Sequence, residues 1–430
     1  MKLVLPYGRN QVEVNIPDNN YLFTAKPSGQ IIPAEDEGKE IREALANPIH
    51  SEPLNKIAEK VKADEKVVII TSDYTRPTPS RRIIPYILEE LKKGGIDSSQ
   101  VQILFASGLH RVMTQEEMID ILGQELSNKI TMSCHDAYND EFVFMGFSKN
   151  NTPIEINKIV ADAKLKISIS TIEPHHAAGW SGGGKNIIPG VASKDTIFAH
   201  HKQMLSQGVG IGIFDGNPFR EDIEDIAISV NVDFICNVIL SEDKRISKVF
   251  CGDVVKAHRE GARVCEKLIS VELPQLADII IASPGGAPRD NNLWQTEGKA
   301  LTRIKDAVKP GGIVIIVSEC SEGVGQDEFK NEIETYLAEG DFERALEKIR
   351  ELSFSPLTNK IARIAKLLQR CNLYFVTSDN MKNMFTKAPF YFFSTPQEAL
   401  ESAFRNLGPE CKVLVVPETP SVVLKAPKFI

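Results

Sequence analysis

The sequence predicts an α/β protein of two domains, and two observations lead to this prediction. Short apolar runs rich in β-branched residues alternate with helical patterns along the chain, which is typical of a parallel, doubly wound sheet. The length of 430 residues and the apolar fraction of 42% suit two or more globular domains. We therefore expect a larger N-terminal domain with a mostly parallel sheet and a smaller C-terminal α/β domain, with the active site in the cleft between them.

The order of the patterns predicts where the domains divide. The N-terminal domain is expected over residues 1–274, and a fresh buried strand at Ala277–Ala282 starts a C-terminal domain over residues 275–411. The closing segment, residues 412–430, is expected to return to the N-terminal domain. Leu293–Val308 predicts one continuous helix in the C-terminal domain.

The N-terminal domain is expected to open with a hairpin, because Gly8-Arg9-Asn10 is a turn signal between short alternating segments. Three buried strands follow at Lys66–Thr71, Val101–Ala106 and Leu165–Ile172, and each leads into a polar loop. Ligands of doubly wound sheets bind beyond the carboxyl ends of the strands. We therefore expect five residues of these loops to converge: Asp73, Arg76, His110, His175 and Lys185.

The third loop contains a glycine run, Gly182-Gly183-Gly184, directly before Lys185. Glycine lets the backbone adopt positive φ and approach a ligand closely. Gly179–Lys185 satisfies the first part of a phosphate-binding P-loop, but Asn186 replaces the Ser or Thr that would bind magnesium, and Pro189 interrupts the helix that should follow. The P-loop pattern is therefore incomplete.

Two other chemistries are compatible with this loop. A lysine beside a glycine-rich phosphate site suits an imine with a carbonyl compound or pyridoxal phosphate. Histidines also gather around the loop, and imidazole commonly binds nickel, copper, zinc or iron. The sequence does not fix which metal these residues would hold: His175, His176, His200 and His201.

The composition excludes several other classes of protein. A net charge of −8 and the lack of a long basic run argue against nucleic acid as a partner. The longest aliphatic runs, such as Ile313–Val317, are of strand length, and the amino terminus lacks the apolar core of a signal peptide. We expect a cytoplasmic protein that crosses no membrane. The seven cysteines are scattered without a Cys-x-x-Cys pair, which predicts neither a disulfide framework nor a thiolate zinc site.

Several segments together carry a family resemblance. The segments are Ser72–Pro77, Ser107–Arg111, Pro174-His175 with the loop Ser181–Lys185, and His201. In order and spacing, over nearly the whole chain, they resemble the successive signatures of the lactate racemase family. The resemblance implies a nickel-pincer nucleotide, a pyridinium mononucleotide with two sulfur arms, that is tethered through a thioamide to Lys185. Nickel is then held by the pincer and by His201, and cofactor-synthesis proteins are implied as partners.

The resemblance also implies roles for the loops. His110 and His175 match the pair of histidines that act as acid and base on the hydroxyl of a 2-hydroxy acid. Arg76 and Lys299 match residues that bind the substrate carboxylate, and Gln295 adds a contact. The remaining residues match cofactor-binding positions: Asp73, Ser181, Gly182, Gly183 and Gly184.

The chain departs from the family pattern at a few positions. Lys299 lies one residue further from Gln295 than in the lactate enzyme, and His176 replaces an apolar residue beside His175. These departures point away from lactate itself and leave room for a larger or more polar 2-hydroxy acid, such as a sugar acid. The sequence thus predicts an isomerase, a racemase or epimerase at C2 of a 2-hydroxy acid. The alternatives are a nucleotide- or phosphate-cofactor enzyme that uses Lys185, and a non-catalytic protein that binds an organic anion.

Overall fold

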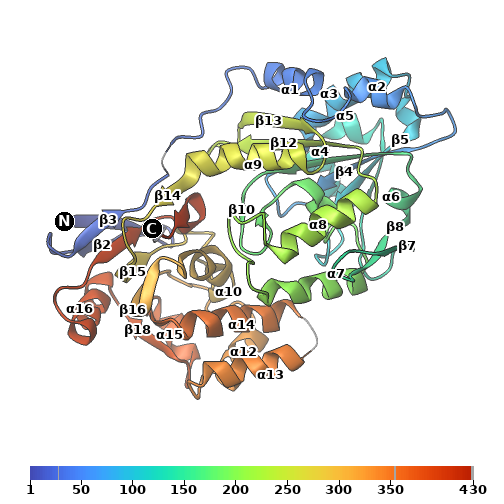
Figure 1. Ribbon diagram of the computed structural model, residues 1–430. Coiled ribbons are helices and arrows are strands. Elements are labelled where there is room, and N and C mark those ends of the chain that lie inside the picture. The colour runs from blue at the N-terminus through green and yellow to red at the C-terminus, as the bar shows by residue number, and fades with distance from the viewer. Residues whose placement is uncertain (28, 353–354, 428–430) are drawn as a thin grey trace. The chain divides into compact units, whose positions relative to one another are not determined.

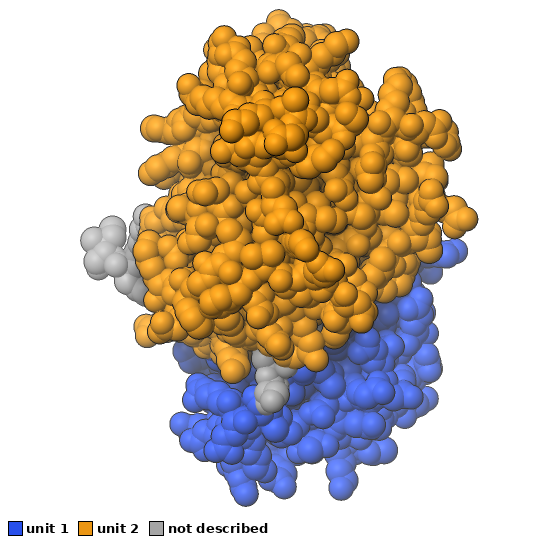
Figure 2. Space-filling model, turned by 90° about the vertical axis from the view of Figure 1, so that its right-hand side faces the viewer, with its two compact units in different colours: residues 1–29, 268–430 blue, residues 30–267 orange. Residues whose placement is uncertain are grey.

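A computed structural model describes residues 1–27, 29–352 and 355–427 (Figure 1). The chain divides into two compact units, residues 30–267 and residues 1–29 with 268–430 (Figure 2). Both units are α/β, as the sequence predicts. No helix in the described ranges is both long and apolar enough to cross a membrane.

The unit of residues 30–267 contains a six-stranded sheet in the order β13-β12-β9-β4-β5-β6. All neighbours are parallel except β12 and β13. From β4 the chain winds outward through β5 and β6, then returns to the other side of β4 to form β9, β12 and β13. The strands are β4 (Val67–Ser72), β5 (Val101–Ala106), β6 (Thr131–Cys134), β9 (Leu165–Thr171), β12 (Phe234–Leu240) and β13 (Ile246–Gly252).

Alternate residues of the central strand β4 serve two separate cores. Val67 and Ile69 pack on the side of helices α1 to α5, whereas Val68 and Ile70 pack on the side of α7 and α8 (Figure 1). Because successive side chains of a strand point to opposite faces, an unbroken apolar run is buried on both. The helices are α1 (Glu37–Ala46), α2 (Leu54–Ala58), α3 (Ser80–Lys93), α4 (Gln115–Leu122), α5 (Gln124–Ser127), α6 (Lys158–Asp162), α7 (Lys194–His201), α8 (Pro218–Ser229) and α9 (Lys256–Ile269).

Three short antiparallel ladders accompany the two sheets. A hairpin of β7 (Phe142–Phe147) and β8 (Pro153–Asn157) lies in the unit of residues 30–267, and β10 (Pro174–His175) pairs with β11 (Gly179–Trp180) in the loop after β9. In the other unit, β1 (Lys2–Tyr7) and β2 (Asn10–Asn15) form the expected opening hairpin.

The second unit contains a six-stranded, all-parallel sheet in the order β18-β17-β16-β15-β19-β3. In addition, β14 (Ser270–Glu272) pairs with β20 (Val423–Lys425). The sheet strands are β3 (Tyr21–Thr24), β15 (Ala277–Ala282), β16 (Val308–Val317), β17 (Cys371–Val376), β18 (Phe390–Phe393) and β19 (Val413–Val416). The helices are α10 (Leu293–Thr296), α11 (Thr302–Ile304), α12 (Asp327–Leu337), α13 (Phe342–Glu351), α14 (Pro356–Leu368), α15 (Asp379–Met384) and α16 (Pro396–Leu407).

The observed division corrects the expected domain boundaries. Residues 1–29 belong with 268–430 rather than with an N-terminal domain of residues 1–274, because β3 pairs with β19 and the hairpin packs into the same core as β15. For the same reason, residues 412–430 do not return to the N-terminal domain: β19 lies between β15 and β3. Residues 428–430 of that segment lie outside the described residues.

Candidate active site

The loop after β4 holds a buried carboxylate and an exposed arginine. Asp73 is 2% exposed, and its Oδ1 accepts a hydrogen bond of 2.6 Å from the Thr75 hydroxyl. The Arg76 amide closes a turn onto the carbonyl of Asp73 at 3.2 Å, and the Arg76 side chain is exposed. The loop therefore fixes the carboxylate while leaving the guanidinium accessible.

His110, in the loop after β5, contacts this carboxylate directly. Its Nδ1 lies 2.7 Å from Asp73 Oδ2, and the imidazole is 48% exposed. Burial acts to raise the pKa of Asp73, but hydrogen bonds from His110 and Thr75 outweigh it and hold the pKa below its ordinary value. Since an ionised carboxylate only accepts, Nδ1 of His110 carries the hydrogen. The lone pair of the neutral ring is then on Nε2.

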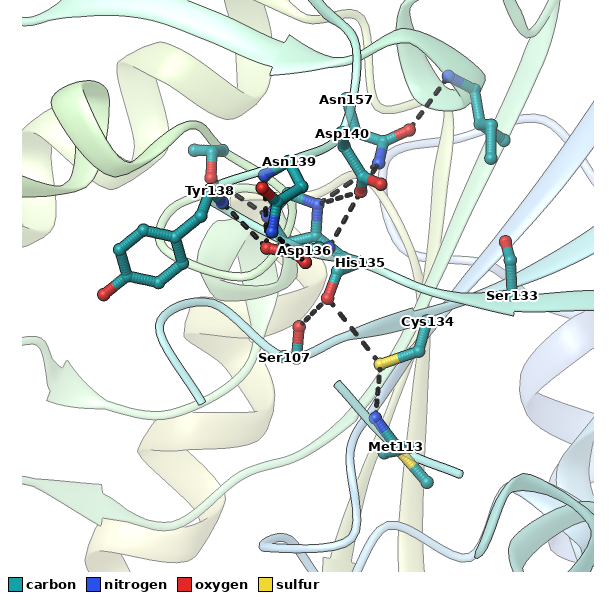
Figure 3. Close-up of polar contacts among 12 residues, drawn as sticks. Ser107, Met113, Ser133, Cys134, His135, Asp136, Tyr138, Asn139, Asp140 and Asn157 are labelled. Carbon is teal, nitrogen blue, oxygen red and sulfur yellow. Dashed lines mark hydrogen bonds and ion pairs between the residues drawn. The ribbon is translucent and has the colours of Figure 1, made fainter. Parts of the chain in front are cut away.

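Two further contacts fix the loop that carries His110. The Ser107 hydroxyl donates to the carbonyl of His135, whose buried ring approaches Asp140 and Asn157 (Figure 3). The Gly108 amide donates to the carbonyl of Gly190 at 3.0 Å, beyond the glycine run. The loops after β5 and β9 are thus joined through their backbones.

His175 follows β9 and is held by backbone amides rather than by a carboxylate. Its Nδ1 accepts from the N–H groups of Ala177 and Ala178 at 3.2 and 3.0 Å. Nδ1 therefore holds a lone pair, and the hydrogen of the neutral ring is on Nε2. His176 stacks on this ring with the centroids 4.4 Å apart.

The surroundings of His175 disfavour its charged form. Burial lowers the pKa of His175 well below 6.5, and the charged forms of Lys185, His176, Arg76 and Arg220 act in the same direction. The same contributions show that the structure brings His175, Lys185 and Arg76 together, as the strand-end argument predicts.

The glycine run packs against the protein. Gly182 and Gly183 have φ of +88° and +61°, and the Gly183 amide donates to Asn237 Oδ1 at 2.8 Å. A Cβ on Gly183 would lie 2.8 Å from Cγ of His258, and one on Gly184 would lie 2.7 Å from another Cβ. Close packing against these neighbours therefore explains the glycines, and the amide of Gly183 is not available to a phosphate.

Ser181 is likewise used by the loop itself. Its hydroxyl donates to the carbonyl of Thr171 at 2.8 Å and accepts from the amide of Glu173, also at 2.8 Å. These bonds fasten the glycine run to the end of β9. Ser181 thus shapes the loop in this structure.

Lys185 is half-buried among positive groups. Burial, together with Arg76 and Arg220, lowers the pKa of its ammonium well below 10.5. Within the described part of the chain, no carboxylate lies within the 4.0 Å ion-pairing distance of its Nζ. A lowered pKa favours the neutral amine, which is the nucleophilic form of a lysine and can form a covalent bond.

Arg220 on α8 is a site residue that the sequence did not reveal. Its guanidinium is 0% exposed, and Nε donates to the carbonyl of Ala178 at 3.0 Å. Burial lowers its pKa to about 10, so it stays charged at neutral pH. Among the described residues, Nη1 of Arg220 and Nε1 of Trp180 have no hydrogen-bond partner. Buried donors without acceptors are costly, so these two atoms suit an anionic ligand.

The end of α7 carries two histidines with different surroundings. His200 is fully buried, and burial lowers its pKa to about 4. His201 is partly exposed, and burial, His200 and Lys185 lower its pKa well below 6.5. In the described ranges, no three His, Cys, Asp or Glu side chains are grouped to hold a metal ion.

Gln295 and Lys299 belong to the other unit. In place of one long helix from Leu293 to Val308, the chain forms α10, a π-helical turn at Glu297–Leu301 and α11, and β16 already begins at Val308. Both side chains are exposed, whereas Glu297 is fully buried. Their assignment to the substrate remains a prediction.

Glu297 fixes this π-helical turn through two ion pairs. Its carboxylate lies 2.7 Å from Lys360 Nζ and 2.8 Å from Arg363 Nε. Burial acts to raise its pKa, but the two cations outweigh burial and lower the pKa to about 2. Paired charges of this kind hold the backbone between Gln295 and Lys299 in one conformation.

Two family models and two relatives match this chain. Residues 7–212 match the lactate racemase N-terminal domain, and residues 273–424 match the lactate racemase C-terminal domain. The lactate racemases of Thermoanaerobacterium thermosaccharolyticum and Lactiplantibacillus plantarum are 32% and 31% identical to this chain, each over 98% of it and over 98% and 99% of their own lengths.

Solved structures show the same relationship. The lactate racemase apoprotein from T. thermosaccharolyticum superimposes with a TM-score of 0.87 at 30% identity, covering 99% of this chain and all of that one. A Thermotoga maritima protein shares the fold, with a TM-score of 0.64 at 18% identity over 92% of this chain and all of that one. The chain therefore belongs to the lactate racemase family and is an isomerase of the racemase class.

Proposed function

We propose that this protein inverts C2 of lactate or a related 2-hydroxy acid, with His110 and His175 as acid and base and a nickel-pincer nucleotide attached to Lys185. One observation carries the proposal. Two histidines on loops that follow neighbouring strands of β4 present opposite hydrogen-bonding groups beside Arg76 and Lys185. The names of the relatives support lactate as the first substrate to test.

His110 supplies the base. Because Asp73 accepts the Nδ1 hydrogen, Nε2 of His110 has a lone pair that can take the proton of the C2 hydroxyl. Asp73 also stabilises the charged ring once that proton has arrived, as a carboxylate does for a catalytic histidine in hydrolases.

His175 supplies the partner on the opposite face of C2. Two backbone amides occupy its Nδ1, so any proton that it exchanges with substrate passes through Nε2. In this structure that nitrogen carries the hydrogen. The two rings therefore present one acceptor and one donor to the C2 oxygen, as inversion between two faces requires.

Arg76 is assigned to the substrate carboxylate. Its guanidinium is exposed, and arginine binds carboxylates through two parallel hydrogen bonds. Gln295 and Lys299 are proposed as further substrate-binding residues.

The residues present fit the proposed cofactor in three respects. The lowered pKa of Lys185 favours its neutral amine, the form that can enter a thioamide link. Arg220 and Trp180 have buried donors without partners, which suit the nucleotide's anionic group. His201 provides a single imidazole, which suits nickel whose other ligands belong to the pincer. When bound, the cofactor would accept the hydride from C2 and return it. Proteins that synthesise the cofactor are therefore proposed as partners.

Intact-mass and nickel measurements test this proposal. Protein produced together with the cofactor-synthesis enzymes is expected to carry one covalent adduct and bound nickel, and to racemise lactate or a related acid. The matched variant Lys185→Met keeps an unbranched side chain of similar length without the amine, and it is expected to show neither the adduct nor turnover. An active wild-type enzyme without adduct and nickel contradicts the proposal. Trapping of an imine at Lys185 by borohydride would instead favour a carbonyl or pyridoxal phosphate chemistry.

A further inference from the structure

His200 and His201, the last two residues of α7, contact each other through their ring nitrogens. Their Nδ1 atoms lie 3.3 Å apart, and the two ring planes meet at 70°. In a hydrogen bond between two such nitrogens, one carries the hydrogen and the other the lone pair. The remaining contacts of His200 decide which ring donates.

The second nitrogen of His200 faces a group that only accepts. Nε2 of His200 lies 3.1 Å from the carbonyl oxygen of Phe219, so Nε2 must carry a hydrogen. A second hydrogen on Nδ1 would turn this fully buried ring into a cation.

The neighbouring carboxylate forms no hydrogen bond with His200. Asp222 Oδ2 lies 4.0 Å from Nε2 of His200, beyond hydrogen-bonding distance. The same oxygen already accepts hydrogen bonds of 2.6 Å from Thr152 and 2.8 Å from Gln203. His200 is therefore neutral, and its Nδ1 holds a lone pair.

This arrangement dictates the tautomer of His201. Its Nδ1 must donate to Nδ1 of His200. The lone pair of His201 is then on Nε2. Binding of a metal by histidine requires a nitrogen with a lone pair, and the hydrogen bond of the other nitrogen selects which one.

We infer that His200 is a positioning residue that fixes the hydrogen of His201 on Nδ1 and so makes Nε2 the metal-binding atom. The use of that atom for nickel rests on the proposed function, but the position of the hydrogen does not. Phe219 contributes through its carbonyl and through packing, because its ring centroid lies 4.1 Å from that of His200.

Nitrogen-15 NMR of the apoprotein at a pH where the histidines are neutral tests this inference. We expect His201 to show a protonated Nδ1 and an unprotonated Nε2. The variant His200→Gln keeps an acceptor and a donor and is expected to preserve this pattern, whereas His200→Phe has no acceptor and is expected to move the hydrogen partly or fully to Nε2. A wild-type His201 protonated on Nε2, or a pattern unaffected by His200→Phe, overturns the inference.

His135→Gln is the matched control. His135 is another fully buried histidine whose Nε2 lies 3.0 Å from a backbone carbonyl, that of Ala192. Its substitution is expected to leave the pattern of His201 unchanged. A change of the same size as in His200→Phe would show that the tautomer of His201 responds to any loss of packing in the protein core. That result would overturn the specific role of His200.

Nickel retention separates this inference from the proposed function. In cofactor-loaded protein challenged with a chelator, His200→Phe is expected to retain nickel about 10- to 100-fold less tightly, and His200→Gln close to wild type. If His201→Ala retains nickel as well as wild type, the proposed ligand is wrong while the NMR result stands. If nickel retention requires His201 but the tautomer of His201 does not change in the His200 variants, the inference is wrong and the proposed function stands.

Discussion

The loops of His110 and His175 follow strands on either side of β4, yet they prepare their histidines in opposite ways. Nδ1 of His110 is hydrogen-bonded to the carboxylate of Asp73, whereas Nδ1 of His175 accepts hydrogen bonds from the amides of Ala177 and Ala178. A carboxylate draws the hydrogen to the near nitrogen, and two amides exclude it from there. The far nitrogen is thus an acceptor in His110 and a donor in His175.

The comparison shows how one sheet edge provides both halves of acid–base catalysis. Each histidine exposes only Nε2 to a substrate, because its Nδ1 is occupied by protein. The backbone contacts that set His175 come from a two-residue ladder, β10 with β11, while the contact that sets His110 spans two strands. Substitutions that disturb one partner are therefore expected to affect one histidine at a time.

The largest effect is expected from Asp73→Asn in the cofactor-loaded enzyme. The amide would donate to Nδ1 of His110 and move the hydrogen to Nε2, which abolishes the base. We expect kcat/KM to fall by about 10²- to 10⁴-fold, the usual contribution of general base catalysis. Chiral chromatography of the product measures this loss, and intact mass checks that the adduct at Lys185 remains.

Asp140→Asn is the matched control for that substitution. Asp140 also contacts a histidine, His135, at 3.1 Å, but outside the candidate site. Its variant is expected to retain kcat/KM close to wild type. Equal losses in the two variants would mean that the contact of Asp73 with His110 has no special role.

An intermediate effect is expected on stability in mild acid. The pKa of His175 is lower in the folded chain than its ordinary value of 6.5. Below about pH 6.5 the unfolded state therefore binds a proton that the folded state does not bind. Stability should therefore fall as the pH drops below about 6.5. Urea unfolding at pH 7.5 and 5.5 is expected to show this decrease in wild type and a smaller one in His175→Gln. An equal decrease in both would contradict the lowered pKa.

The smallest effect is expected from His176→Leu. Stacking of His176 on His175 is worth about 0.5–1.5 kcal/mol, so its loss should lower kcat/KM by about 2- to 10-fold. The variant also removes a positive neighbour, and the pKa of His175 should rise. Both changes are measurable, the first by chiral assay and the second by NMR titration. A pKa of His175 that stays or falls would contradict the electrostatic coupling.

The sequence predicted the strands that position the site, because their signals are local. Buried runs of β-branched residues located β4, β5 and β9. In the polar loops behind them His110 contacts Asp73, and His175 is influenced by Arg76 and Lys185. The roles of these residues stay a prediction. Arg220 was missed because it reaches the site from α8, in a segment without a motif. The signal that could have drawn attention to it is a charged residue within an apolar helical face.

The domain boundaries were not predictable from local patterns. The pairing of Tyr21 with Val413 joins segments near opposite ends of the chain, and nothing in either segment specifies its partner. Similarly, the glycine run suggested a phosphate cradle, but its close neighbours Asn237 and His258 come from β12 and α9. Residues distant in the sequence thus pack against the glycine run, and its local motif alone does not reveal this packing.

The most direct test of the two-histidine account is a chiral time course with cofactor-loaded wild type, His110→Asn and His175→Asn, started from each enantiomer of lactate or of the 2-hydroxy acid that wild type turns over best. The account predicts that either substitution slows interconversion about 100-fold or more in both directions, with nickel and adduct retained. A variant that still interconverts the enantiomers at the wild-type rate would contradict it.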